Sequence, residues 1–299
     1  MTKKIKSITI YRKDLPPEGA ETESPGEEQI VSKTTYHPDF DKITLEEQYG
    51  ATGELEQSTE FTYDEDGFLI REVLKEADGT VMEEKSYEAD GHKRVAREYL
   101  HYADGSRDII SYTYDDEGNI IKKLTVDADG DVEETEEFQY EGGHLVLEVK
   151  RDESGELVVE TKYHYEDGKL LGIESQDGIE GADYRRVYTY NDKGHRESVM
   201  LYDADDNPLE RVLLEADEKG RPVKVVEENR QKKNTLHLRY DDTGNVVFQE
   251  EFDLNGALVS RVERTYDKEG RLLESRIDQN VPSHGISRSY LVRQEYTFD

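Results

Sequence analysis

A short turn sequence recurs along this chain at a nearly constant spacing, and this repetition constrains the fold more than any other feature. One series of turn glycines recurs every 24 to 27 residues, at Gly67, Gly91, Gly118, Gly143, Gly168, Gly194, Gly220, Gly244 and Gly270. A second series lies between its members, at Gly53, Gly79, Gly105, Gly130, Gly155 and Gly256, with Gly181 and Asn207 where the next two are expected. A period near 25 residues that holds two turns predicts a stacked or winding architecture, in which no single unit is stable alone.

The residues of each turn match a tight β-hairpin. In the segment Tyr114–Gly118, Asp115 stands where a type I turn needs a side-chain acceptor for the local backbone N–H. Gly118 is expected to take the left-handed conformation that closes the hairpin with a bulge. An aliphatic pair, Ile120-Ile121, follows one polar residue later. The tyrosine that ends one strand should therefore lie across the hairpin from the aliphatic residue that begins the next.

Between the turns, apolar and polar side chains alternate with a period of two over eight or nine residues, the usual length of a β-strand. In Val132–Tyr140, apolar residues gather near the strand ends while the middle is polar on both faces. About twenty such strands follow one another from Tyr49 onward, so the sequence predicts an all-β antiparallel meander. A sheet of that size should curl into a single-layer sheet or partial shell, and the twist per strand decides whether it closes, spirals or stays elongated.

Three segments are expected along the chain. Residues 1–48 hold an N-terminal strand and a flexible acidic loop, because residues 12–28 are rich in Pro, Gly and Glu. Residues 49–277 form the repeat array. Residues 278–299 form a C-terminal loop and a closing strand, since Pro282 and Gly285 interrupt the period.

The chain is strongly acidic, with 71 Asp and Glu residues against 39 Lys and Arg residues and a formal net charge of −32. Such a charge repels nucleic acid and anionic lipid, so a charged partner is expected to be a basic protein. The absence of Cys excludes disulfides and thiolate metal sites. No run approaches the ~20 apolar residues of a membrane span, and Ile5–Tyr11 is too short and too polar for a signal peptide. We therefore expect a cytoplasmic protein that does not bind membranes.

The motif Tyr-Asp-x-x-Gly-x-aliphatic resembles the YD repeat of Rhs and teneurin-type proteins. It occurs as Y-D-E-D-G-F-L, Y-D-D-E-G-N-I, Y-D-D-T-G-N-V and Y-D-K-E-G-R-L, and the resemblance covers about residues 49–277. In that family, many such repeats form a β-shell that encloses a toxic C-terminal segment. This chain has far fewer repeats, and it has neither an Asp-Pro-x-Gly motif nor a toxin domain after them. As a free-standing array, it is also similar to short Tyr/Gly-repeat bacterial antitoxins that are grouped with MORN repeats.

Several residue groups could suggest a site, and each has a simpler structural explanation. Asp127–Asp131 resembles a calcium loop, but its glycine stands at the fourth position rather than the sixth, so an ordinary hairpin is favoured. Acidic pairs are too abundant to mark a glycoside hydrolase, and the eight histidines lack metal-ligand spacing. Most of the tyrosines occupy one repeat position, which favours a structural role. The sequence therefore indicates no catalytic, metal or cofactor site, and we expect a protein that is not an enzyme.

Two functions agree with these observations. The first is protein binding, in which an acidic surface captures a basic protein such as a nuclease toxin, as an immunity protein or antitoxin does. The candidate surface is the middle of Val132–Tyr140, where Glu133, Glu134, Glu136 and Glu137 project from both faces. The second is a structural scaffold or spacer of a bacterial secretion or surface apparatus, which would assemble through strand edges or apolar patches.

Overall fold

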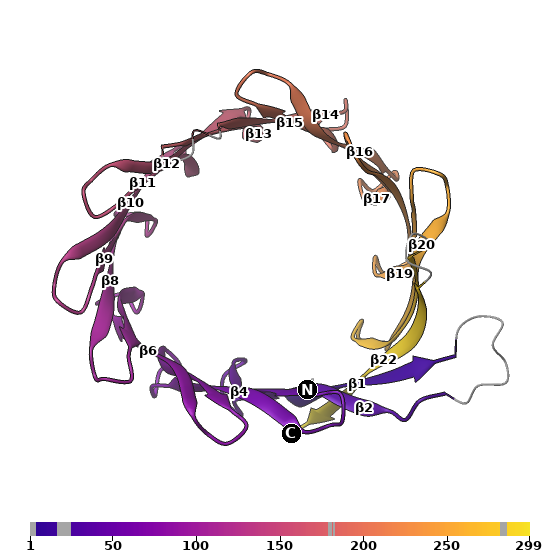
Figure 1. Cartoon of the computed structure of the whole chain (residues 1–299), viewed down its shortest axis with the longest axis horizontal. Coiled ribbons are helices and arrows are strands. Elements are labelled where there is room, and N and C mark those ends of the chain that lie inside the picture. The colour runs from indigo at the N-terminus through magenta and orange to yellow at the C-terminus, as the bar shows by residue number, and fades with distance from the viewer. Residues whose placement is uncertain (1–3, 17–24, 179–180, 182, 282–285) are drawn as a thin grey trace. The chain divides into compact units, whose positions relative to one another are not determined.

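The chain folds into antiparallel β-strands joined by short turns (Figure 1). The computed structural model describes residues 4–16, 25–178, 181, 183–281 and 286–299. Its strands are β1 (Ile5–Leu15), β2 (Gln29–Tyr36), β3 (Ile43–Tyr49), β4 (Leu55–Tyr63), β5 (Leu69–Glu76), β6 (Val81–Ala89), β7 (Val95–His101), β8 (Arg107–Tyr114), β9 (Ile120–Val126), β10 (Val132–Glu141), β11 (His144–Arg151), β12 (Leu157–Glu166), β13 (Lys169–Asp177), β14 (Tyr184–Tyr190), β15 (Arg196–Asp203), β16 (Pro208–Ala216), β17 (Pro222–Asn229), β18 (Lys233–Tyr240), β19 (Val246–Phe252), β20 (Leu258–Tyr266), β21 (Leu272–Val281) and β22 (Ile286–Phe298).

The all-β prediction is confirmed, because every regular element in the described part of the chain is a strand. The strand pairs for which a register is established are all antiparallel, as in the meander that we expected. The described residues include no helix long and apolar enough to cross a membrane.

The β8–β9 hairpin confirms the turn chemistry. Glu117 and Asn119 donate their backbone N–H groups to Asp115 Oδ1 over 3.0 and 2.8 Å. Gly118 has a φ of 91°, in the left-handed region, and its N–H donates to the Asp115 carbonyl over 3.2 Å. The register shifts beside the turn so that Tyr114 faces Ile120, which is the predicted bulge and the predicted tyrosine–aliphatic pair.

Two turns depart from the glycine series. In the turn after β6, Lys93 rather than Gly91 takes the left-handed conformation, with a φ of 61°. In the turn after β15, Asp206 does so with a φ of 60°, so Asn207 does not take the place of a glycine. In both turns, the left-handed residue is the one whose N–H donates to the carbonyl three residues earlier, that of Asp90 or Asp203. Its position in the turn therefore decides the conformation, rather than its residue type.

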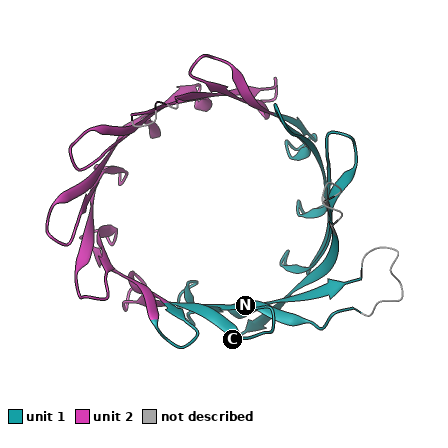
Figure 2. Cartoon of the chain, in the orientation of Figure 1, with its two compact units in different colours: residues 1–60, 75–80, 212–299 teal, residues 61–74, 81–211 magenta. Residues whose placement is uncertain are grey.

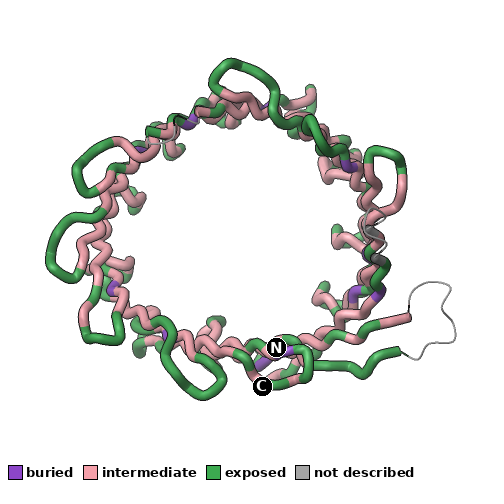
Figure 3. The backbone as a smooth tube through the Cα atoms, in the orientation of Figure 1, coloured by how far each residue is buried: buried purple, intermediate pink, exposed green. Residues whose placement is uncertain are grey.

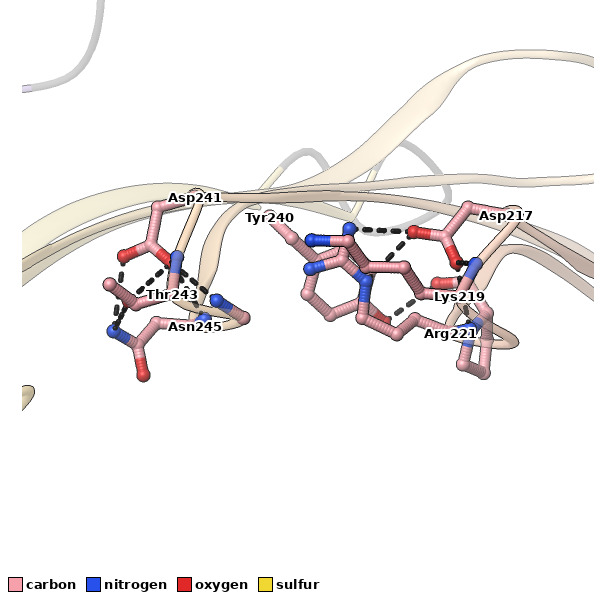
Figure 4. Close-up of polar contacts among 9 residues, drawn as sticks. Asp217, Lys219, Arg221, Tyr240, Asp241, Thr243 and Asn245 are labelled. Atoms are coloured by element: carbon pink, nitrogen blue, oxygen red, sulfur yellow. Dashed lines mark hydrogen bonds and ion pairs between the residues drawn. The ribbon is translucent and has the colours of Figure 1, made fainter.

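A recurring set of contacts ties several hairpins to the one before, and Figure 4 shows one example. The Tyr240 hydroxyl donates to the Pro222 carbonyl over 2.7 Å, and the Arg221 guanidinium lies 4.4 Å from the centre of the Tyr240 ring. Arg221 Nε also donates to Asp217 Oδ2 over 2.8 Å. The same hydroxyl-to-carbonyl bond recurs from Tyr114 to Val95, Tyr190 to Leu170, Tyr266 to Val246 and Tyr296 to Leu272. The repeated tyrosine therefore has the structural role that its position indicated.

The chain divides into two compact units, coloured separately in Figure 2. Unit 1 comprises residues 1–60, 75–80 and 212–299, and unit 2 comprises residues 61–74 and 81–211. Each unit is a single curved layer of strands. The buried apolar residues are scattered along the strands (Figure 3), and they are Val73, Tyr99, Val149, Tyr188 and Val262. Each unit is therefore held mainly by contacts between neighbouring strands.

Within unit 1, the first and last strands pair with each other (Figure 1). The β1–β22 register runs antiparallel from Ile5 opposite Phe298 to Leu15 opposite Ser289. Ser7 and Thr297 share a hydrogen bond of 2.7 Å between their hydroxyl oxygens. Our expectation of an open curled sheet or partial shell is therefore wrong at this point, because neither terminal strand is a free edge.

The segment boundaries also differ in detail from the expected ones. Residues 12–15, expected in the N-terminal loop, belong to β1, and β2 and β3 lie before the expected start of the array. Likewise β21 extends to Val281, into the expected C-terminal loop. The predicted interruption at Pro282 and Gly285 lies outside the described residues.

Candidate functional site

The four glutamates proposed from the sequence lie on β10, in unit 2. Three of them pair with lysines on the neighbouring strands: Glu136 with Lys123 on β9 over 3.2 Å, Glu137 with Lys122 on β9 over 3.4 Å, and Glu134 with Lys150 on β11 over 2.5 Å. Glu133 is exposed and lies where the β9–β10 register shifts.

The β10 glutamates project from both faces, as the alternation predicted. Glu134 and Glu136 lie opposite Thr125 and Lys123, whereas Glu137 lies opposite Lys122 and therefore faces the other way. The lysine partners neutralise three of the four charges locally. The middle of β10 is therefore a weaker source of negative potential than its sequence indicated, and Glu133 is the member that forms no ion pair with any described residue.

Other glutamates on the strands of unit 2 accept hydrogen bonds from tyrosines. The Tyr112 hydroxyl donates to Glu98 Oε2 over 2.9 Å, and the Tyr163 hydroxyl donates to Glu148 Oε2 over 3.2 Å. Burial and the neighbouring Glu148 charge raise the pKa of Tyr163 to about 12, so the phenol remains a donor at neutral pH. These carboxylates thus have partners within the sheet.

Exposed carboxylates lie in the turns at both edges of unit 2, such as Asp129 at one edge and Asp116 and Glu117 at the other. In an antiparallel meander, all turns from an odd-numbered to an even-numbered strand lie at the same edge. We define the acidic edge as the exposed carboxylates in or beside the turns β7–β8, β9–β10, β11–β12 and β15–β16 that form no ion pair with a described residue, which leaves out Asp206 because it pairs with Arg185. They belong to Asp104, Asp129, Asp131, Glu133, Glu153, Glu156 and Asp205.

The acidic edge keeps its negative charge. In the part of the chain that the structure describes, none of its seven carboxylates forms an ion pair. The hydroxyl and backbone N–H of Ser106 lower the pKa of Asp104. Strands lie about 4.8 Å apart, so the turns β7–β8, β9–β10 and β11–β12 follow at intervals of about 10 Å, and the β15–β16 turn lies two such intervals farther along. This interval is close to the Debye length at ~0.1 M salt, so the charges of adjacent turns act on an approaching partner together.

The opposite edge of unit 2 carries more basic residues. Its turn after β6 contains Lys93 and Arg94 beside Asp90, and the Arg94 guanidinium lies 2.6 Å from the Asp90 carboxylate. Hydrogen bonds from the backbone and side chain of Arg94 lower the pKa of Asp90 to about 2. The turn after β8, with Asp115, Asp116 and Glu117, is acidic. The opposite edge therefore has both acidic and basic turns.

The segment that resembled a calcium loop is a hairpin turn. Asp127 Oδ1 accepts the backbone N–H groups of Asp129 and Asp131 over 2.9 and 2.8 Å. Gly130 is left-handed, with a φ of 92°. Across the described residues, no group of three or more His, Asp or Glu side chains is arranged to hold a metal ion.

Comparisons with known proteins find similar solved structures but assign the chain to no family. No family model matches the sequence, and no curated protein matches it. Among solved structures, a porin-like protein from Bacteroides uniformis is 11% identical over 99% of both chains, with a TM-score of 0.36. TcdB2-TccC3 without its hypervariable C-terminal region is 12% identical over 81% of this chain, with a TM-score of 0.30, and the match spans only 19% of that chain. Both TM-scores are below 0.5, so neither likeness supports a conclusion about this protein.

The sequence analysis missed the acidic edge because it assigned the turn residues to turn chemistry alone. The turn sequences D-A-D-G-D, D-E-S-G-E and D-A-D-D-N each contain carboxylates beyond the one that caps the turn. Turns of the opposite edge, such as D-E-D-G and D-D-E-G, also contain extra carboxylates, so a count along the sequence does not separate the two edges, and the difference depends on which carboxylates form ion pairs.

Proposed function

We propose that this chain is a non-enzymatic repeat protein that captures a basic protein through its acidic edge, in the manner of an immunity protein or antitoxin. The observation that carries the proposal is the set of exposed carboxylates of the acidic edge, in four turns of unit 2, which form no ion pair with any described residue. The Tyr-Asp turns and their contacts between hairpins support a place among YD-repeat proteins, which we propose on that ground alone.

Electrostatic attraction fits this arrangement. A line of like charges spaced within about one Debye length produces a field that steers an oppositely charged protein and raises its association rate. A net charge of −32 extends that attraction beyond the edge itself. The expected partner therefore presents a positive patch, and nucleic acid is not expected to bind.

The alternative role, a scaffold that assembles through strand edges, has less support. Assembly through strand edges needs free edges, and the two chain-terminal strands, β1 and β22, pair with each other. Strand addition at the termini of the array would have to break that pairing first.

The test is the salt dependence of the association rate with the partner. Purifying the protein from its native cells identifies what accompanies it, and stopped-flow mixing then measures association. We expect the rate to fall about tenfold or more as salt rises from ~20 to ~500 mM. An association rate that is unchanged over this range would overturn the proposal.

Charge-reversal variants locate the interaction. Asp129→Lys with Asp131→Lys, at the acidic edge, should slow association about fivefold or more at low salt. Asp116→Lys with Glu117→Lys is the matched control, because it makes the same change in net charge at the opposite edge of the same unit. We expect less than about a twofold effect from the control. Equal effects would place the binding surface elsewhere than the acidic edge.

A further inference from the structure

A groove of about 580 Å³ lies at the acidic edge of unit 2, beside β14, β15 and the start of β16. Its lining includes Asp183, Tyr184, Leu201, Asp203, Asp205 and Leu209. Tyr184 and Asp203 are direct cross-strand partners, so ring and carboxylate lie side by side.

The floor of the groove is apolar and open to solvent. Tyr184 and Leu209 are each 38% exposed, so both side chains are accessible to a partner. The rim carries three carboxylates, Asp183, Asp203 and Asp205, against the one cation, Arg186, that also lines it. A long cationic side chain matches both surfaces, since its aliphatic stem can cover the floor while its charged end meets the rim.

An arginine of this chain, Arg185, already lies between a tyrosine ring and a carboxylate close to the groove. Arg185 is the neighbour of Tyr184 on β14 and points to the other face of the sheet. There its guanidinium lies 4.6 Å from the centre of the Tyr202 ring and 2.7 Å from an oxygen of Asp206. On that face, an arginine is thus held between an aromatic ring of β15 and a carboxylate of the β15–β16 turn.

We infer that the groove binds an arginine side chain of the basic partner, as an anchor for the capture described above. The guanidinium stacks on Tyr184 and meets the rim carboxylates, and its stem packs on Leu209. A planar guanidinium can stack and bind a carboxylate through two N–H groups at once, whereas a lysine ammonium does neither as well. The inference rests on the proposed function and names the residue through which the partner is held.

The test compares two peptides of equal charge, fluorescein-labelled nona-arginine and nona-lysine, by fluorescence anisotropy with the full chain at ~150 mM salt. Wild type should bind nona-arginine about fivefold more tightly than nona-lysine. Tyr184→Ala should remove that preference and leave nona-lysine binding unchanged. Tyr102→Ala is the matched control, because Tyr102 is an exposed tyrosine, 43% accessible, at the same edge but outside the groove.

A second pair of variants separates the groove from general charge. Asp205→Asn removes a rim carboxylate, and Asp129→Asn removes the carboxylate at the same position of the β9–β10 turn. Asp205→Asn should weaken nona-arginine binding about threefold more than Asp129→Asn does.

The outcomes distinguish the inference from the proposed function. Equal affinity of wild type for the two peptides, or equal losses from Tyr184→Ala and Tyr102→Ala, would overturn the arginine groove. If both peptides still bind in a salt-dependent way, the proposal of capture through the acidic edge stands without the arginine groove. If wild type binds neither peptide even at ~20 mM salt, the groove and the proposed function both fail.

Discussion

Replacing Gly118 with valine isolates the contribution of one left-handed turn residue. Gly118 has a φ of 91°, a region that residues with a Cβ rarely adopt. A Cβ built there would meet only Arg94 Nη1, at 3.6 Å, which is an ordinary van der Waals distance from the end of a flexible side chain. The penalty of Gly118→Val therefore comes from the backbone and not from a clash.

Its magnitude follows from two routes open to the variant. If the introduced valine stays left-handed, the strain is about 1 to 3 kcal/mol, with a β-branched residue near the upper end. If the turn relaxes, it weakens the 3.2 Å bond from Gly118 N–H to the Asp115 carbonyl and the 2.8 Å bond from Asn119 N–H to Asp115 Oδ1. Two such bonds are worth about 1 kcal/mol each, so either route predicts a loss of about 1 to 3 kcal/mol.

The assay combines urea unfolding, followed by circular dichroism, with amide hydrogen exchange. Exchange is needed because a repeat array can open locally, and the protection of Asn119 reports this hairpin directly. Glu117→Ala is the control, since Glu117 is exposed and contributes its backbone N–H to the turn, and it should change stability by less than about 0.5 kcal/mol. Gly118→Asn should lie between the two, because asparagine tolerates the left-handed region. Equal losses from Gly118→Val and Glu117→Ala would refute the reasoning.

Three further predictions test the contacts between hairpins, the turn carboxylates and the pairing of the termini. Tyr240→Phe removes the hydroxyl that bonds to the Pro222 carbonyl and keeps the ring, so it should reduce the free energy of unfolding in urea by about 1 kcal/mol; no loss would argue against the contact. The Thr243 hydroxyl and turn N–H groups lower the pKa of Asp241 to about 2, below its value of about 4 in an unfolded chain, so its stabilising effect is complete above pH ~4 and lost as the pH falls toward 2. Acid titration of Asp241→Ala should therefore show a smaller loss of stability over that window, and an Asp241 pKa near 4 by NMR would contradict this. Deleting residues 286–299 removes β22 and exposes β1 and β21 as edges, so light scattering should detect self-association; a stable monomer would count against the observed pairing.

The sequence by itself determined the strands and most of the turns. Asp115, Gly118 and their counterparts act on backbone groups within four residues, so their chemistry is complete in the local sequence. The alternation of side chains likewise gave the strands, because its period is a property of each extended segment alone. The two wrong positions, Gly91 and Asn207, came from reading residue type where the place in the turn mattered.

The tertiary structure decided the electrostatics and the pairing of the ends. Glu136 and Glu137 looked like an acidic surface until the β9–β10 register set them opposite Lys123 and Lys122, and register depends on how a turn aligns two strands. The β1–β22 pairing joins residues almost 300 positions apart, as between Ile5 and Phe298. Such a contact is not encoded in any local motif, because a repeat motif specifies only the pairing of a strand with its neighbours in sequence.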